Sequence, residues 1–248
     1  RLTPVVVSSV MSSYAKATYT RDMGIFDHLV ELMVQNIKEY SNRQVVGGLW
    51  ACARMFSYEK ALPDHSDTFP LYLLNIADLV AEIVERADYL TPKDTAQALY
   101  TLGLLEYKEQ GIVSVLAQRA KELSSLFNGQ ELANVLWGMS KAESKSFDVV
   151  FVLIRRLEDD DSLNLSPQEA SNVLYALGRL DLRHEAVFTK LCNLILDQIE
   201  SASAQSVANV LWASRAVYFR PPQKLLDTWA IKKLGLVAIE PSEQREGM

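Results

Sequence analysis

The sequence predicts an all-α fold, an α-solenoid of about six tandem helix-turn-helix repeats of 37–38 residues, and three regularities lead to this prediction. A leucine followed by an aromatic residue recurs along the chain, good helix N-cap residues precede each such pair at a fixed distance, and a second apolar helical period follows it. Recurring helix pairs of this length are typical of α-solenoids, because one pair cannot bury its apolar face without a stacked neighbour. A hydrophobic content of 49% suffices for such a core, and 10 Gly and 8 Pro argue against a loop-rich β fold.

The leucine–aromatic pair is the strongest signal of the repeat. The aromatic residue of each pair, called the anchor below, is Trp50, Tyr100, Trp137, Tyr175 or Trp212. A weaker copy ends at Met11, and the successive spacings are then 39, 50, 37, 38 and 37 residues. The interval from Trp50 to Tyr100 is 13 residues longer than 37, which predicts an inserted loop near residues 60–70.

Helix starts are predicted by N-cap residues nine positions before each anchor. Their side-chain oxygens can accept from the free amides of the first helical turn. Pro92 and Pro167 follow at the favoured first helical position, and Gln44, Glu131 and Glu169 have the spacing of a capping box or a close variant. The five predicted caps are Ser41, Thr91, Asn128, Ser166 and Ser203. Each repeat therefore begins with a helix that runs from the cap through the anchor.

The domain prediction is one repeat array over residues 1–235 and a polar C-terminal tail over residues 236–248. The second helix of each repeat has its own apolar period, as in Phe26 to Ile37 and Val187 to Ile195. The predicted repeats are approximately 1–40, 41–90 (with the inserted loop), 91–127, 128–165, 166–202 and 203–235.

Three positions of the first helix form a predicted polar face. They lie seven and three residues before the anchor and four after it, and at about 100° per residue they share one side of a helix. The leucine before the anchor lies opposite and is predicted to be buried. The face carries Arg43 and Arg54, then Lys93 and Gln97, then Gln130, Asn134 and Lys141, then Gln168, Asn172 and Arg179, and finally Gln205, Asn209 and, one place off the pattern, Arg215.

The polar face has two interpretations, which the sequence leaves open. The amides could satisfy one another between neighbouring helices, with Lys and Arg near helix C-termini favoured by the helix dipole. Alternatively, the face could bind an extended partner, with amides for base edges and cations for phosphates. A net charge of −6 counts against indiscriminate nucleic-acid binding, but it permits a local basic groove.

Three segments resemble a known class of repeat: QELANVLWGM (130–139), QEASNVLYALG (168–178) and QSVANVLWA (205–213). They are similar to octotricopeptide or heptatricopeptide repeats, and to the helical region of proteins with a FAST-kinase-like or RAP domain. The resemblance covers most of the chain, from about Pro4 to Gly235. It implies an organelle protein, mitochondrial or alternatively plastid, that binds RNA through the polar-face residues of the first helices.

The resemblance also implies particular partners. They are organelle rRNA or mRNA and the other proteins of a ribonucleoprotein assembly, which include an organelle ribosome in which the array is a structural component. A first residue that is Arg rather than Met would fit the removal of a transit peptide. The alternative is a protein–protein scaffold within a large organelle complex, since solenoids often serve this purpose.

No catalytic, metal-binding or cofactor-binding pattern is found in the sequence, so we expect no enzyme activity, metal or cofactor. His28, His65 and His184 lack the spacing of zinc ligands, and Cys52 and Cys192 are predicted to be small core residues. The acidic run 159–161 is predicted to be a solvated turn, and the Gly47-Gly48 pair lies in a predicted helix interior. No apolar run is long enough for a membrane span.

Overall fold

The computed structural model describes residues 2–61 and 70–234, and every regular element among them is a helix. The predicted all-α class is therefore confirmed. The chain divides into two compact units, Arg1–Leu163 and Asn164–Met248, and the division falls two residues before the predicted cap Ser166. Each unit is described by itself below. No helix in the described residues is both long and apolar enough to cross a membrane.

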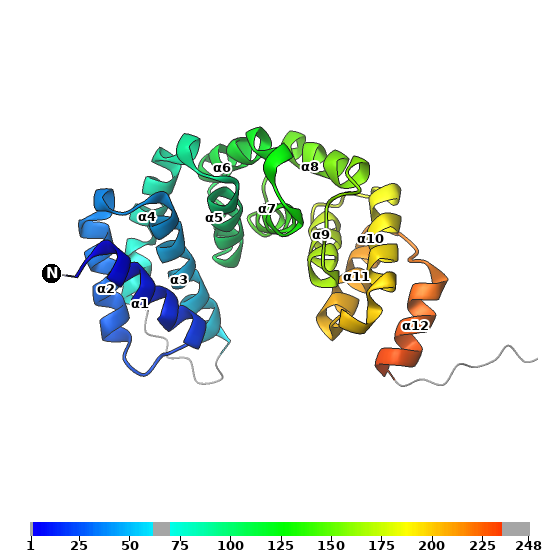
Figure 1. Ribbon diagram of the computed structural model, residues 1–248, viewed down its shortest axis with the longest axis horizontal. Helices are drawn as coiled ribbons and strands as arrows, with labels where there is room; N and C mark the ends of the chain where they lie inside the picture. The colour runs from blue at the N-terminus through cyan, green and yellow to red at the C-terminus, as the bar shows by residue number, and fades with distance from the viewer. Residues whose placement is uncertain (1, 62–69, 235–248) are drawn as a thin grey trace, which may run out of the picture. The chain divides into compact units, whose positions relative to one another are not determined.

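Unit 1 contains two rows of helices. In one row α1, α3, α5 and α7 contact one another in order, and in the other α4, α6 and α8 do so (Figure 1). The short helix η2 lies between α2 and α4. The elements are α1 (Pro4–Ala17), α2 (Met23–Gln35), η1 (Ile37–Glu39), α3 (Asn42–Lys60), η2 (Leu71–Asn75), α4 (Ile76–Glu85), η3 (Ala87–Tyr89), α5 (Pro92–Leu104), α6 (Gln110–Glu122), η4 (Ser124–Leu126), α7 (Gly129–Lys141) and α8 (Phe147–Asp159).

Unit 2 repeats the same arrangement on a smaller scale. Helix α9 packs along α11, and α10 contacts both α9 and α12. The elements are α9 (Pro167–Arg179), α10 (Glu185–Asp197), η5 (Ile199–Ser201), α11 (Ala204–Ala216) and α12 (Gln223–Leu234).

The five predicted N-caps are confirmed. In each, the side chain accepts a hydrogen bond from the backbone amide three residues later. The capping boxes at Ser41, Asn128 and Ser166 are complete, because Gln44, Glu131 and Glu169 accept in return from the cap amide. Local side-chain hydrogen bonds therefore fix where these five helices begin.

The C-terminal ends of the first helices share a capping motif that was not predicted from the sequence. A residue in the left-handed conformation follows α1, α5, α7, α9 and α11, and the next amide donates to the carbonyl five residues back, as from Leu182 to Leu177 at 3.0 Å. This is a Schellman-type cap, which glycine usually marks. Here the left-handed residues are Thr18, Glu106, Glu143, Asp181 and Tyr218, with φ between 48° and 54°.

Replacing Asp181 with glycine is expected to raise the free energy of unfolding by roughly 0.5–1 kcal/mol. The left-handed conformation is costly for a residue with a Cβ and is freely available to glycine, although glycine gains more entropy on unfolding. The measurement is chemical denaturation. Asp197→Gly, at the end of α10, is the control and should destabilise. Equal destabilisation by both variants would contradict this explanation of the cap.

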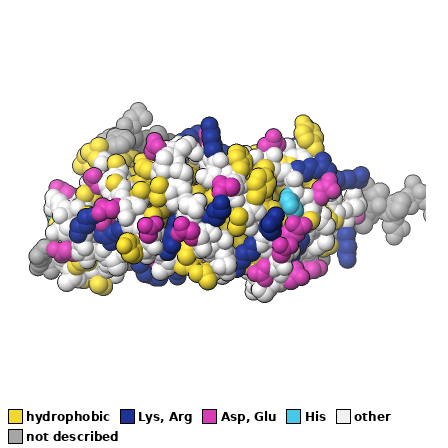
Figure 2. Space-filling model, turned by 90° about the horizontal axis from the view of Figure 1, so that it is seen from above, with side chains coloured by type: hydrophobic (Ala, Val, Ile, Leu, Met, Phe, Trp, Pro, Cys, Tyr) yellow, Lys and Arg dark blue, Asp and Glu magenta, His cyan; other side chains and the backbone are white. Residues whose placement is uncertain are grey.

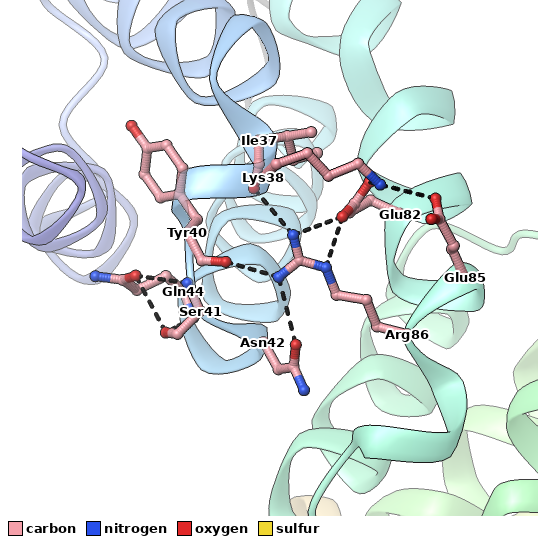
Figure 3. A network of polar contacts seen from close by, with 9 residues as sticks. All are labelled: Ile37, Lys38, Tyr40, Ser41, Asn42, Gln44, Glu82, Glu85 and Arg86. Atoms are coloured by element: carbon pink, nitrogen blue, oxygen red, sulfur yellow. Dashed lines mark hydrogen bonds and ion pairs between the residues drawn. The ribbon is translucent and has the colours of Figure 1, made fainter.

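Arginines tie successive helix pairs together in unit 1. Arg86 donates to the carbonyls of Ile37 and Tyr40, at 3.0 and 2.6 Å, and pairs with the buried carboxylate of Glu82 (Figure 3). Lys38 also reaches Glu82, at 2.8 Å. Equivalent arginines follow in the next two repeats: Arg119 donates to the Leu90 carbonyl and Arg156 to the Ser124 carbonyl. These bonds satisfy backbone acceptors at the junction that precedes each first helix.

The leucine before the anchor is buried as predicted in four of five repeats. Leu49, Leu99, Leu136 and Leu174 are at most 1% exposed. The prediction is wrong for Leu211, which is 46% exposed. On α9 this side faces α11, whereas the described part of unit 2 places no further first helix against the corresponding side of α11.

Three smaller expectations have clear outcomes. Both cysteines are buried, and burial raises the pKa of Cys192 to about 12, as expected for core thiols. The Gly47-Gly48 pair lies inside α3. Helix α3 has 19 residues against 13 in α5, so part of the predicted insertion lengthens this helix. Residues 62–69 of the predicted loop, with His65, and the predicted tail 236–248 lie outside the described residues.

Candidate nucleic-acid interface

Four of the first helices, α3, α5, α7 and α9, each leave one narrow face open. On α7, Gln130 is exposed and Asn134, Trp137 and Lys141 are half-buried, while every other residue of the helix except Glu131 is buried. Helices α5 and α9 have the same pattern of exposure, and so does α3 from Val45 to Met55. The open face therefore lies at the anchor and at the three positions predicted to be polar, and we call it the first-helix face.

The aromatic anchors belong to this face, which the sequence analysis did not recognise. The anchor is only about 20–60° from the polar positions on a helical wheel, so the helical period of the sequence also places it on this face. The rings of Tyr100 and Trp137 lie 4.8 Å apart between centroids, and those of Tyr175 and Trp212 are also 4.8 Å apart. Each unit thus carries a pair of partly exposed rings in tilted contact beside amides.

Close helix packing makes these ring contacts possible. Six-membered-ring atom Cζ3 of Trp137 lies 3.1 Å from where a Cβ on Gly103 would be, and Trp212 has the same relation to Gly178. Gly103 and Gly178 both stand three residues after an anchor. The small residue on one helix therefore creates the place in which the next tryptophan ring rests.

In unit 2 the amides form a hydrogen-bonded network. Gln168 donates to Asn172 at 2.9 Å, Asn209 donates to the same Asn172 oxygen at 3.2 Å, and Gln205 donates to Asn209 at 2.9 Å. The Gln168 oxygen accepts from Ser203 at 3.1 Å. The interpretation in which the amides satisfy one another between neighbouring helices is therefore correct for α9 and α11, where Asn209 is only 7% exposed. The network leaves the amino group of Asn172 unused within the described residues.

In unit 1 the amides are unengaged. The side chains of Gln97, Gln130 and Asn134 make no hydrogen bond with described residues, although all three lie on the first-helix face. Gly47 takes the corresponding position on α3, and a Cβ there would meet nothing within 4 Å. Unit 1 therefore presents donors and acceptors that solvent or a ligand must satisfy.

The predicted cations lie at the two ends of the face. Arg43 and Lys93 are exposed near the N-termini of α3 and α5, where the helix dipole disfavours a positive charge. Arg54 is exposed at the other end, and its charge affects the hydroxyl of Tyr100. Burial raises the pKa of Tyr100, and the Arg54 charge opposes that rise. Lys141 pairs with Glu106 at 2.9 Å.

The cations of unit 2 pair with aromatic rings. Arg179 lies 6.0 Å from the centre of the Tyr175 ring, and Arg215 lies 5.3 Å from that of Tyr218. Arg215 is about 120° around α11 from Asn209. Arg215 is therefore the one predicted residue that does not share the face with the amides of its helix.

Charge is distributed unevenly between first and second helices. Helices α3, α5, α7, α9 and α11 hold seven Lys or Arg residues but only four acids, and three of those acids, Asp94, Glu131 and Glu169, bond to N-caps. The other acid is Glu59, which accepts from the Tyr72 hydroxyl at 2.8 Å. The net charge of −6 therefore does not describe these first helices, which are locally basic.

The sequence matches no protein-family model and no curated protein. Within residues 2–61 and 70–234, no three His, Cys, Asp or Glu side chains converge as metal ligands would. The arrangement of the first-helix face, in which rings, amides and cations recur at fixed positions, is thus the feature from which a function can be inferred.

Proposed function

We propose that this chain is a non-enzymatic α-solenoid that binds single-stranded RNA along its first-helix faces. The observation that carries the proposal is the recurrence of an amide, an aromatic ring and a cation on one open face of neighbouring helices. Aromatic rings can stack on unpaired bases, amides can bond to base edges, and cations can contact phosphates. These are the three contacts through which proteins commonly bind single-stranded RNA.

The resemblance to octotricopeptide or heptatricopeptide repeats supports the same proposal. It suggests a mitochondrial protein, or alternatively a plastid one, that acts in RNA metabolism or as a structural part of the organelle ribosome. The net charge of −6 fits a protein that works among others in a ribonucleoprotein assembly, where neighbouring proteins share the neutralisation of phosphate.

The test removes cations from the first-helix face of unit 1. In the triple variant Arg43→Gln, Arg54→Gln and Lys93→Gln, affinity for a single-stranded RNA oligonucleotide should fall. Each phosphate contact contributes about 0.7 to the slope of log affinity against log salt, so the slope should decrease in magnitude by about 2. Fluorescence anisotropy across a series of salt concentrations measures both quantities.

A matched control makes the same charge change elsewhere in unit 1. Arg21, Lys145 and Arg155 are exposed and lie outside the first helices. Their triple change to Gln should leave the salt slope near that of the original chain. Equal losses in the two triple variants would mean that binding depends only on net charge, and the proposal would then be wrong.

A protein scaffold is the second candidate, and one observation favours it. Phe147 and Phe151, one turn apart on α8, are 40% and 54% exposed. Exposed apolar side chains close together can mark a protein-binding surface. Figure 2, viewed from the side on which α6 and α8 lie in Figure 1, shows apolar side chains among charges of both signs. A partner protein that co-purifies after nuclease treatment, and is lost from Phe151→Ser, would support this candidate.

A further inference from the structure

A cleft opens in unit 1 where the C-terminal ends of α3, α5 and α7 meet. Its volume is about 390 Å³, which falls within the range of clefts that hold small molecules. Its lining includes Phe56, Lys60, Leu104, Glu106, Trp137 and Lys141. The cleft therefore combines an aromatic and aliphatic wall with two lysines and one carboxylate.

Trp137 is held in a fixed orientation at this cleft. Its ring packs against the Tyr100 ring in a tilted arrangement, with 4.8 Å between centroids, and its edge rests over Gly103. A fixed aromatic surface loses little conformational freedom when a planar ligand stacks on it. The wall thus suits a flat aromatic ring such as a nucleobase.

The polar groups of the cleft form an ordered pair. Lys141 Nζ donates to Glu106 Oε1 at 2.9 Å, and the Glu106 side chain is 50% exposed. The hydrogen bond from Lys141, together with the charges of Lys141, Lys60 and Lys108, holds the pKa of Glu106 below its ordinary value. Glu106 is therefore ionised at neutral pH, so its second oxygen can only accept hydrogen bonds.

We propose that this cleft selects a guanine base, with Trp137 stacked on its ring, Lys141 donating to O6 and Glu106 accepting from N1–H and the 2-amino group. The Watson–Crick edge of guanine presents one acceptor followed by two donors, which complements an ammonium beside a carboxylate. At the position of guanine O6, adenine and cytosine instead carry an amino group, which would face the donors of Lys141. At the position of the guanine 2-amino group, uracil carries a carbonyl oxygen, which would face the Glu106 carboxylate. The mismatched bases would therefore leave charged groups unpaired.

The inference rests on the proposed function and adds base selectivity to it. Lys60, on the last turn of α3, makes no ion pair with described residues and could contact the adjoining phosphate. The guanine could belong to an RNA strand or to a free nucleotide. Both present the same guanine base, so the experiment tests RNA and the free nucleotide separately.

The experiment compares four oligouridine octamers that carry G, A, C or U at the centre, and in parallel guanosine and adenosine 5′-monophosphates. The original chain should bind the G octamer about tenfold more tightly than the A octamer, as expected for a bidentate contact to a base edge. Glu106→Gln should reduce that preference to less than twofold. Anisotropy measures the octamers, and saturation-transfer NMR measures the mononucleotides.

Glu143→Gln is the matched control. Glu143 has the same left-handed backbone as Glu106, is 55% exposed and pairs with Lys108 at 2.6 Å, yet it does not line the cleft. Its variant should keep the G preference. Equal binding of all four octamers would overturn the guanine pocket and leave RNA binding intact. Binding of guanosine monophosphate without any octamer would instead overturn RNA binding and support a free nucleotide. Binding of neither would overturn both.

Discussion

Gly138→Ala is expected to lower the free energy of unfolding by about 3 kcal/mol, at the upper end of overpacking effects. A Cβ on Gly138 would overlap the carbonyl group of Leu99 and would lie 2.7 Å from the Tyr100 amide nitrogen. These are backbone atoms of α5, which cannot rotate away as a side chain could. Helix α7 would have to move from α5, and the contact between the Tyr100 and Trp137 rings would be disturbed with it.

Gly47→Ala is the control for this prediction. Gly47 is also inside a first helix, but a Cβ there meets nothing within 4 Å. Alanine should therefore stabilise the protein by about 1 kcal/mol, the usual difference in helix propensity. Denaturant unfolding measures both variants. If Gly138→Ala proved as stable as Gly47→Ala, the close approach of α5 and α7 would be refuted.

Arg86→Ala has the second large expected effect, a loss of about 3–5 kcal/mol at neutral pH. The substitution leaves the Glu82 carboxylate, which is 6% exposed, without its nearest charge partner and removes the donors to two backbone carbonyls. Lys38 remains, but its side chain is 64% exposed and already also bonds to Glu85.

We expect the pH dependence of this loss to identify Glu82 as its source. Burial alone would raise the pKa of Glu82, but the hydrogen bonds and charges of Lys38 and Arg86 together lower it. A lowered pKa stabilises the fold above the ordinary value of 4.5, and this contribution is lost as the pH falls through the folded pKa. The difference between the original chain and Arg86→Ala should therefore shrink below about pH 4.5.

Arg119→Ala is the comparison for Arg86→Ala. Arg119 also bonds to a backbone carbonyl of the preceding junction, but its acidic partner Glu122 is 48% exposed. A loss of about 1–2 kcal/mol is expected, as for one hydrogen bond to a charged donor. Urea denaturation between pH 3 and 7 measures the series. Equal losses at all pH values for the two variants would show that the buried carboxylate does not matter.

Helix positions could be predicted from the sequence because local chemistry specifies them. Asn128 and Glu131 form a capping box within one turn, so the start of α7 requires no knowledge of the rest of the chain. The burial of Leu136 followed from the repeat in the same way. Leu211 shows where this reasoning stops, since its burial depends on whether another helix lies against α11.

The remaining features arise from packing between helices, which spacing alone does not reveal. Glu106 and Lys141 lie in different repeats and meet only because α5 and α7 pack closely at Gly103 and Gly138. The Arg86 network likewise joins residues more than 40 positions apart. The left-handed caps escaped prediction because residues other than glycine occupy them.

The most direct test of RNA binding by the first-helix faces is photo-crosslinking of the chain to single-stranded RNA that contains 4-thiouridine, followed by mass-spectrometric mapping of the crosslinked peptides. We expect crosslinks in α3, α5, α7, α9 and α11, concentrated at the partly exposed rings of Trp50, Tyr100, Trp137, Tyr175 and Trp212. Crosslinks found mainly in α2, α4, α6, α8 and α10, or none above the level of a denatured control, would contradict it.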